Sequence, residues 1–512
     1  MGKRYAIAAG HRLTAETGAE VLQAGGTAMD AAMAAALMAM VAEPVLAGLL
    51  GGGFAMVRLP DGRCELLDAF VDTPRRKRPE GEVAMEEIHA DFGGTLQGFR
   101  IGTGTIAAPC LAAGLAEAHA RHGRMALRDL TQPAVEAARV GVPLTPYQAR
   151  LAEIVRPILV ATPSARALWC AADGAHLLAE GARWRNPAFA DVLEEFGRAG
   201  PRFVSEGEIA SALLEAARDG GHLTRADAEA CQPIWRSPLV ERRGAATVLL
   251  NPPPSLGGLL IAFAQALMEH GAPPVTVARA FVATAEARAE AGLDGDLDAG
   301  AAQLADSAFR VTMRQRMTTT RGHKPARRGT THISVIDGEG LGVALTLSNG
   351  EGAGLILPGT GIMPNNMLGE DDLVPEDPLG WRTGARLASM MAPMAILWPD
   401  GRAALLGSGG SNRIRTALAQ VVAQVVDAEM PLDAAIAAPR LHAEGTDPMR
   451  LDFEEAGLAE GHRAGLLAAF PEARGWAQPS MFFGGVHGVM RDARGGLSAA
   501  GDARRDGIGL AG

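Results

Sequence analysis

The chain is 512 residues long, enough for about two to four average domains or for one large layered fold. Its net charge of −10 argues against nucleic acid as the main partner, because neutralising phosphates calls for a basic face. Hydrophobic residues make up 48% of the sequence, so a substantial core can form. The N-terminus has no apolar run long enough for a signal peptide, and the longest apolar run, Ala31 to Ala42, is too short to span a membrane. We therefore expect a cytoplasmic globular protein that contacts neither nucleic acid nor membrane.

The spacing of potential metal ligands predicts no metal or other cofactor. Four cysteines occur, without the C-x-x-C spacing of a zinc knuckle or a thioredoxin-type pair: Cys64, Cys110, Cys170 and Cys231. His119 and His122 have a metal-like spacing on a predicted helix, but no third ligand is evident. The cysteines are best interpreted as free thiols in a reducing compartment.

The N-terminal segment predicts two helices and a β-hairpin. Thr14 to Gln23 has a helical pattern, and Ala28 to Ala42 predicts a second helix that is small and apolar almost all round, so it should be buried between layers. After a glycine-rich turn, Phe54 to Leu59 and Arg63 to Ala69 predict the hairpin.

Helical patterns dominate the middle of the chain, from about Ala107 to Met317. Residues 318–329 are polar, basic and contain Pro and Gly, which predicts an exposed linker. A basic cluster at 75–78 is typical of a solvated loop, although one of its arginines could bind an anion.

The stretch that follows the linker, Arg327 to Asp337, predicts a loop that runs directly into a strand. Its β-branched residues favour a strand, residues 337–340 predict a turn, and Leu341 to Leu347 predicts the returning strand. A threonine that becomes a chain terminus gains an amine that can act as base for its own hydroxyl. The pattern therefore raises the question of whether the protein cuts its own Gly329–Thr330 bond.

A second notable turn follows another predicted strand pair, Ala392 to Leu397 and Arg402 to Leu406. The turn, Gly407 to Asn412, opens a predicted helix, Arg415 to Asp427, and its backbone N–H groups would suit an anion or a developing oxyanion. Strand pairs and helices occur in blocks without βαβ alternation, which predicts sheets covered by helices.

Several of these stretches together resemble the γ-glutamyltranspeptidase family of N-terminal nucleophile hydrolases. The most specific is Thr330 to Asp337, which is similar to the family's nucleophile strand. The other stretches that carry the resemblance are 25–32, 43–44 with 51–54, 252–258 and 502–507.

The resemblance implies an α+β fold, a four-layer αββα sandwich, made as one precursor that cleaves itself between Gly329 and Thr330. The products would be a large subunit, residues 1–329, and a small subunit, residues 330–512, which remain associated as one domain and could pair into a dimer of heterodimers.

The same resemblance implies catalytic roles. Thr330 would be the nucleophile, and its free α-amine, with an ordinary pKa near 8, would be the base. Either Thr346 or Ser348 would be the supporting hydroxyl, and backbone N–H groups of Gly409 and Gly410 would form the oxyanion hole.

The sequence departs from the family pattern in the substrate pocket. Phe70 stands where the family has an arginine that grips the substrate carboxylate, and only Ser389 remains of a pair of serines. Glu370, rather than an aspartate, would meet the substrate amine. The remaining expected pocket residues are Asn349 and Ser411.

An arginine from another part of the chain could replace the missing one, and Arg75, Arg76 and Arg386 are the candidates, with Arg76 included in the predicted site. Without a replacement, loss of a bidentate partner should weaken carboxylate recognition by several kcal/mol. The reaction class therefore transfers from the family better than the γ-glutamyl specificity does.

Several substrates remain open for this small-amide chemistry. A γ-glutamyl compound such as glutathione is the family's usual substrate; an oxamate-type amidohydrolase and a cephalosporin-type acylase are alternatives. An unprocessed, non-catalytic binding protein on the same scaffold is a fourth interpretation. A serine hydrolase is disfavoured because the sequence has no G-x-S-x-G elbow.

Overall fold

The structure is a computed structural model, and it describes residues 4–91, 96–293, 295–317, 329–370, 377, 379–444 and 450–512. Apart from Gly329, the predicted linker at 318–329 lies outside these residues. Within the described ranges, no helix is both long and apolar enough to cross a membrane.

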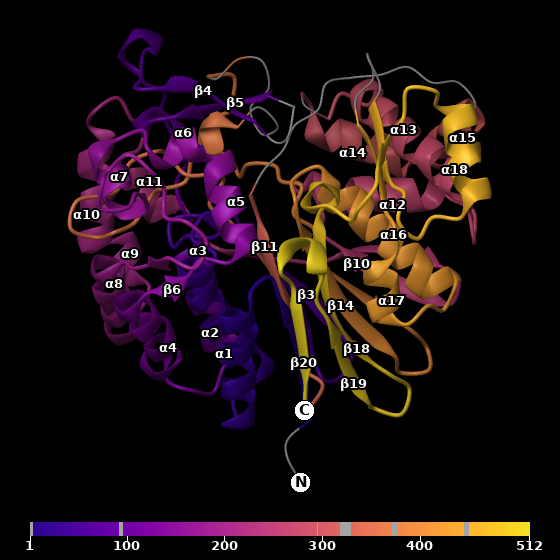
Figure 1. Cartoon of the computed structure of the whole chain (residues 1–512), viewed down its shortest axis with the longest axis horizontal. Helices are drawn as coiled ribbons and strands as arrows, with labels where there is room; N and C mark the ends of the chain where they lie inside the picture. Colours follow the sequence, from indigo (N-terminus) through magenta and orange to yellow (C-terminus); the bar gives the residue numbers. More distant parts are fainter. Residues whose placement is uncertain are drawn as a thin grey trace.

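Two antiparallel sheets form the centre of the molecule (Figure 1). The first sheet has the order β20 (Ile508–Ala511), β1 (Tyr5–Ala9), β11 (Thr331–Asp337), β12 (Gly342–Ser348), β2 (Gly52–Arg58), β3 (Cys64–Ala69), β8 (Ile234–Arg236). The second has the order β19 (Leu497–Ala500), β18 (Gly485–Arg491), β14 (Ala403–Gly409), β13 (Met394–Leu397), β10 (Ala246–Leu250), β9 (Leu239–Arg243). Residues before and after Thr330 contribute strands to both sheets, so a cut at that point would leave the two pieces interleaved.

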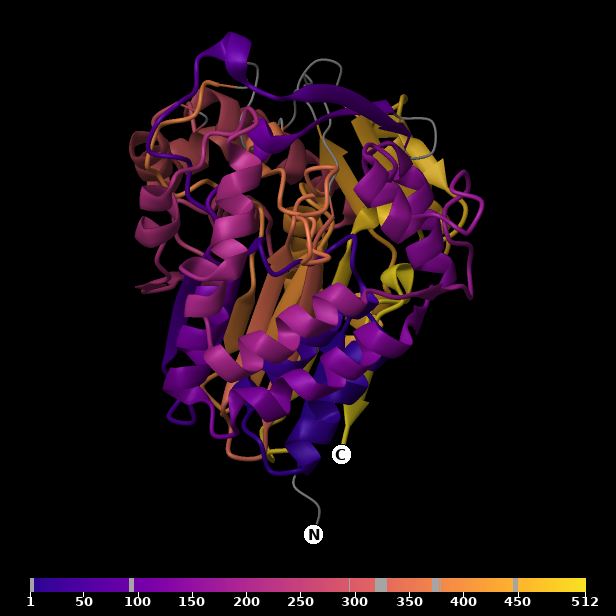
Figure 2. The ribbon, with the colours of Figure 1, turned by 90° about the vertical axis from the view of Figure 1, so that its left-hand side faces the viewer.

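Helices cover both outer faces, which gives the four layers (Figure 1). The layer on the first sheet, seen in front of its strands in Figure 2, contains α1 (Arg12–Gln23), α2 (Ala28–Ala42), α3 (Leu111–His122), α4 (Leu127–Val140), α5 (Pro146–Ile154), α6 (Arg156–Leu159), α7 (Pro163–Trp169), α8 (Pro187–Ala199), α9 (Arg202–Ser205), α10 (Glu208–Ala217) and α11 (Arg225–Ala230). The layer on the second sheet contains α12 (Leu256–Leu267), α13 (Pro274–Glu290), α14 (Leu297–Ala305), α15 (Ser307–Arg316), α16 (Arg413–Asp427), α17 (Leu432–Ala437) and α18 (Glu460–Ala469). The predicted αββα sandwich is confirmed.

Smaller elements surround the sandwich. The short strands are β4 (Glu86–Asp91), β5 (Leu96–Ile101), β6 (Val142–Pro143), β7 (Arg183–Trp184), β15 (Leu441–Glu444), β16 (Arg450–Glu454) and β17 (Arg474–Trp476). The 3-10 turns are η1 (Glu80–Glu82), η2 (Thr103–Thr105), η3 (Met367–Gly369), η4 (Met481–Phe483) and η5 (Ala503–Arg505).

The inner strand β11 is buried on both faces, and its side chains alternate between two cores. Ile333 and Val335 pack towards the first helical layer, whereas Ile336 belongs to the core between the sheets. Helix α2 lies under this strand and is buried along its whole length, as its small apolar sequence predicted. A capping box of Thr27 and Asp30 fixes the start of α2.

The strands at the two chain ends were not predicted. β1 pairs on one side with β11 and on the other with β20, so both ends of the chain complete the first sheet next to the nucleophile strand. The glycine-rich C-terminal tail, residues 501–512, therefore contributes directly to the scaffold of the site.

Candidate active site

Thr330 immediately precedes β11 and is buried, with 5% of its surface exposed. Its Oγ1 donates a hydrogen bond to the carbonyl oxygen of Gly329 at 2.7 Å. The same oxygen accepts a second hydrogen bond, at 2.8 Å, from Oγ of Ser348, the last residue of the neighbouring strand β12. Two hydroxyls thus hold and polarise the carbonyl of the Gly329–Thr330 bond, and one of them is the hydroxyl that would attack it.

The amide side of Gly329 is also fixed. Its N–H donates to Oε1 of the buried Glu351 at 2.7 Å, and the N–H of Gly350 donates to Ser348 Oγ at 3.0 Å. Gly350 has φ +66, and a side chain there would collide with Asn366 and Glu370, so the turn after β12 needs glycine at this point. Gly329 is therefore anchored through both its own N–H and its carbonyl oxygen, and the carbonyl oxygen is the acceptor of the scissile peptide.

The structure distinguishes the two candidate supporting hydroxyls. Thr346 is paired across the ladder with His332, and its Oγ1 hydrogen-bonds His332 Nδ1 at 2.8 Å, away from Gly329. Burial lowers the pKa of His332 well below its ordinary value, with a further contribution from His487, so the ring is neutral. Thr346 therefore belongs to the polar interior between the sheets, and Ser348 alone reaches the carbonyl.

The predicted glycine turn lies directly against Thr330. Gly409 ends β14, and a methyl group placed on it would lie 2.0 Å from the carbonyl oxygen of Thr330. Gly410 follows with φ +119, and Ser411 with φ +55 leads into α16. Only glycine allows the turn to come this close to the nucleophile.

A small cavity of about 30 Å³ opens at the nucleophile, and we call it the nucleophile cavity. It brings together five residues of the predicted site, namely Thr330, Ser348, Glu370, Ser389 and Ser411. The other lining residues are Phe70, Met367, Met390, Met391 and Ile414. Residues that lie far apart in the sequence, from Phe70 to Ile414, thus converge where the sequence predicted a substrate pocket.

The Pro252–Gly258 stretch holds one wall of this cavity. The carbonyl of Ser389 accepts hydrogen bonds from Ser255 Oγ at 3.0 Å and from the N–H of Leu256 at 2.8 Å. A side chain on Gly257 would lie 2.2 Å from the Met390 carbonyl oxygen, so this glycine permits the close approach.

Two members of the predicted pocket lie elsewhere. Asn349 is buried, but its side chain donates to the carbonyl of Met363 at 3.0 Å and lines a different cavity. Arg76 is exposed and is absent from the lining of the nucleophile cavity. The structure therefore brings neither residue to the nucleophile cavity, and their contact with substrate stays a prediction.

The remaining candidates to replace the missing arginine also fail. Arg386 forms ion pairs with Asp68 at 3.0 Å and with Asp72 at 2.6 Å, so its charge is matched within the scaffold. Arg75 is exposed. Phe70, which stands where the family resemblance implies an arginine, stacks on Phe54 with ring centroids 5.5 Å apart.

A second, larger cavity of about 250 Å³ was not predicted, and we call it the arginine cavity. It is lined by Gly329, Glu351 and Gly410 on the side of the scissile bond. Its other lining residues are Val45, Leu46, Arg150, Leu151, Ile154, Val155, Arg413, Arg474, Trp476, Ser480, Met481, Phe482 and Arg505. The Gly329–Thr330 bond therefore lies between two cavities. Arg505 lies within residues 502–507, one of the stretches that carry the family resemblance, but nothing in the local sequence distinguishes it from Arg504.

A buried carboxyl group that was not predicted supports the nucleophile strand. Glu43, at the C-terminal end of α2, accepts hydrogen bonds from Thr331 Oγ1 at 2.6 Å and from Thr14 Oγ1 at 3.1 Å. Burial raises the pKa of Glu43 to about 7, although both hydrogen bonds oppose the rise.

The two facing sheets, the two helical layers and a hydroxyl residue at the start of the inner strand define the class of N-terminal nucleophile hydrolases. The cephalosporin acylase from Bacillus halodurans has this fold: its structure superposes with a TM-score of 0.84 at 22% identity, covering 99% of this chain and 96% of that one.

Sequence comparison defines the family within that class. The model of the Gamma-glutamyltranspeptidase family matches residues 14–512, and the chain belongs to this family. It is 30% identical to the Acylase ACY 1 proenzyme of Pseudomonas sp. (strain V22), over all of this chain and 94% of the relative. It is 28% identical to the Glutathione hydrolase proenzyme of Pseudomonas aeruginosa, over 99% of this chain and 94% of the relative. The protein is thus an amidohydrolase or acyltransferase of the γ-glutamyltranspeptidase and acylase family.

Proposed function

We propose that the chain cleaves its own Gly329–Thr330 bond and then acts as an acylase, with Thr330 as the N-terminal nucleophile. The observation that carries this proposal is the Gly329 carbonyl, which accepts hydrogen bonds from both Thr330 Oγ1 and Ser348 Oγ. The names of the two relatives, both called proenzymes, support it.

In the cleavage step, Thr330 Oγ attacks the carbonyl carbon of Gly329 while its proton leaves. The developing oxyanion keeps the Ser348 hydrogen bond, the C–N bond breaks, and the proton ends on the nitrogen of Thr330. Water then hydrolyses the resulting ester and releases Gly329 as a carboxylate. The cleavage needs no group beyond this chain and one water molecule.

In the turnover step, the new α-amine of Thr330 accepts the proton from Oγ, since its ordinary pKa near 8 is suited to neutral pH. Oγ takes the acyl group from the amide substrate, the amine leaves with the proton, and water or another amine releases the acyl group. We propose that the backbone N–H groups of Gly409 and Gly410 are the donors to this oxyanion, and the close approach of Gly409 to the carbonyl oxygen of Thr330 supports this role.

Acylase activity is favoured over γ-glutamyl transfer by the walls of the nucleophile cavity. Phe70 fills the family's arginine position, and Arg386 is occupied by Asp68 and Asp72. The nucleophile cavity therefore lacks the arginine with which the family binds the γ-glutamyl carboxylate, so the carboxylate of any acyl group would have to be bound elsewhere. An oxamate-type reaction stays a prediction, as do the cytoplasmic location and the dimer of heterodimers.

The test compares amine release from three amides by the incubated native protein: glutaryl anilide, γ-glutamyl anilide and oxamate. We expect glutaryl anilide to react at least as fast as γ-glutamyl anilide, which differs from it only by an α-amine. Clearly faster release from the γ-glutamyl compound would overturn the acylase assignment. Failure of all three, with the chain still intact, would support a non-catalytic binding protein.

A further inference from the structure

Arg505 is a buried cation that lines the arginine cavity, and its known contacts leave its charge unmatched. The residue is 8% exposed. Its Nε and Nη2 both donate to the main-chain oxygen of Met481, at 3.3 and 3.2 Å. Across the part of the chain that the structure describes, no carboxylate lies within ion-pair distance of its guanidinium. A buried arginine cannot shed its proton, so an uncompensated charge of this kind is costly unless an anion meets it.

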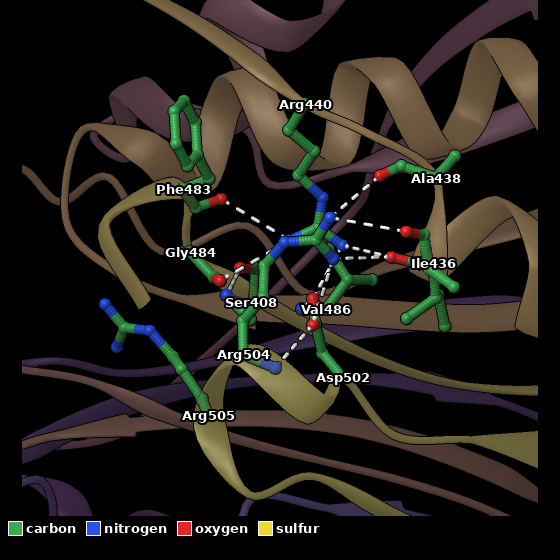
Figure 3. Close-up of polar contacts among 12 residues, drawn as sticks. Ser408, Ile436, Ala438, Arg440, Phe483, Gly484, Val486, Asp502, Arg504 and Arg505 are labelled. Carbon is green, nitrogen blue, oxygen red and sulfur yellow. Dashed lines mark hydrogen bonds and ion pairs between the residues drawn. The ribbon is translucent and has the colours of Figure 1, made fainter. Parts of the chain in front are cut away.

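The neighbouring residue, Arg504, is an arginine whose charge is matched by carboxylates. Arg504 forms ion pairs with Glu454 at 2.5 Å and with Asp502 at 3.2 Å, and Asp502 also pairs with Arg440 at 2.6 Å. Figure 3 shows Arg504 directed into this network and Arg505 directed away from it. Although burial opposes it, Arg440 and Arg504 lower the pKa of Asp502, which keeps the network charged.

This network fixes the backbone from which Arg505 projects. The carbonyl of Asp502 accepts hydrogen bonds from the N–H of Arg505 at 3.1 Å and of Gly507 at 2.9 Å. A methyl group on Gly485 would lie 2.6 Å from Arg505 Cδ, so the chain of Arg505 lies flat on that strand. The guanidinium is therefore held in one place before any ligand arrives, which lowers the cost of binding.

The guanidinium is held beside the nucleophile. A methyl group on Gly409 would lie 3.2 Å from Arg505 Nη1 and 2.0 Å from the Thr330 carbonyl oxygen. One on Gly410 would lie 3.0 Å from Arg505 Nη2. The backbone of these two glycines thus lies between the guanidinium of Arg505 and Thr330, and the distance between the two residues is short.

The rest of the cavity favours an anionic ligand with an apolar chain. Arg413 and Arg474 lie over the rings of Phe482 and Trp476, at 4.7 and 4.6 Å from the ring centroids. These two rings stack on each other with centroids 4.9 Å apart. Four arginines and one carboxylate, Glu351, line the cavity, so cationic side chains outnumber anionic ones in its lining.

We propose that Arg505 is the carboxylate-binding, specificity-determining residue of this enzyme, and that the arginine cavity takes an acyl chain ending in a carboxylate. Gly329 indicates which cavity the substrate acyl group enters. The acyl group of Gly329 is the one passed to Thr330 in the proposed cleavage, and Gly329 lines the arginine cavity. A substrate acyl group on the same Oγ can follow the same path to Arg505. This inference rests on the proposed function, and it supplies a replacement for the missing family arginine from the opposite end of the chain.

The experiment measures kcat and KM of the self-cleaved protein for three amides. Glutaryl anilide carries a carboxylate at the acyl end, pentanoyl anilide ends in a methyl group, and pentanoyl-4-aminobenzoate carries its carboxylate on the amine side. The variants are Arg505→Gln and Arg505→Lys, with Arg494→Gln as a control on an exposed arginine outside both cavities.

We expect Arg505→Gln to raise KM for glutaryl anilide by about 10- to 100-fold and to leave pentanoyl anilide unchanged within about twofold. Arg505→Lys should recover part of the loss, and Arg494→Gln should leave KM for both anilides unchanged within about twofold. Equal losses for both anilides, or a selective loss for pentanoyl-4-aminobenzoate, would overturn the inference. Cleavage at Thr330 in Arg505→Gln reports that the variant folds. If the native protein cleaves itself and hydrolyses pentanoyl anilide without preferring glutaryl anilide, only this inference fails; if it neither cleaves nor hydrolyses, the proposed function fails.

Discussion

The two cavities on either side of the Gly329–Thr330 bond differ in size, in charge and in how they are built. The nucleophile cavity is about 30 Å³, is rich in hydroxyls and methionines, and is lined by residues of recognisable motifs. The arginine cavity is about 250 Å³, is bordered by arginines and aromatic rings, and draws on residues from Val45 to Arg505. The proposed reaction centre and the proposed carboxylate-binding cavity are thus separate structures, and the Gly329–Thr330 bond lies between them.

The largest expected effect comes from substitution of Thr330, the proposed nucleophile, whose bond to Gly329 lies between the two cavities. Thr330→Ala should leave the chain uncut and lower kcat by more than about 1000-fold, because it removes the hydroxyl that both steps require. Thr330→Ser, which keeps the hydroxyl, is the matched control and should cleave and turn over more slowly. Gel analysis and anilide hydrolysis measure the two effects; cleavage in Thr330→Ala would show that another group makes the cut.

Ser348 tests whether the hydrogen bond to the Gly329 carbonyl contributes to cleavage. Ser348→Ala should slow the cut by about 100-fold, since it removes one donor from the developing oxyanion. Thr346→Val is the control: it removes a hydroxyl of the same strand face that bonds His332 instead, so it should lower Tm while cleavage changes by less than about threefold. If the two variants slow cleavage equally, the distinction between these hydroxyls is wrong.

Glu43 lies between the arginine cavity and the nucleophile strand. It precedes Val45 and Leu46, which line the arginine cavity, and it accepts a hydrogen bond from Thr331, the residue after the nucleophile. Its folded-state pKa of about 7 lies above its ordinary value of 4.5, so the folded state holds a proton that the unfolded chain releases. Its contribution to stability is therefore greatest below about pH 4.5 and is lost as pH rises to about 7, on the order of 3 kcal/mol in all.

Calorimetry at pH 5 and pH 8 checks this dependence. Glu43→Gln should lose less Tm than the native protein between the two values, since the glutamine has no charge to bury. Glu339→Gln, on an exposed residue, is the control and should follow the native curve. Parallel curves for Glu43→Gln and the native protein would contradict the raised pKa.

The smallest expected effect concerns Arg76, which the sequence placed in the substrate pocket. Arg76→Ala should change kcat/KM by less than about twofold for any of the anilides, because the side chain is exposed and lies outside both cavities. Steady-state kinetics beside Arg505→Gln is the measurement. A loss with Arg76→Ala comparable to that with Arg505→Gln would contradict the assignment of the substrate carboxylate to Arg505.

Much of the scaffold could be predicted because its signals are local. The alternation after Thr331 and the turn at 337–340 predicted β11 and β12 to within a residue, and the apolar run of α2 predicted its burial. β1 and β20 could not be predicted, since the alanine-rich and glycine-containing strands depend on partners at the other end of the chain.

The site divides in the same way. Ser389, Glu370 and Ser411 converge as their motifs indicated, whereas Thr346 and Ser348 could not be separated, because residues two apart share a strand face and only distance to Gly329 distinguishes them. Arg504 and Arg505 are adjacent in sequence, yet one is matched by Glu454 and the other lines a cavity. Three-dimensional contacts alone assign them different roles.

The most direct test of the account is the intact mass of the purified, incubated protein together with N-terminal sequencing of its smaller chain. We expect two chains, residues 1–329 and 330–512, with the smaller one beginning at Thr330. A single chain that stays uncut on prolonged incubation, or a smaller chain that begins at another residue, would contradict Thr330 as the nucleophile.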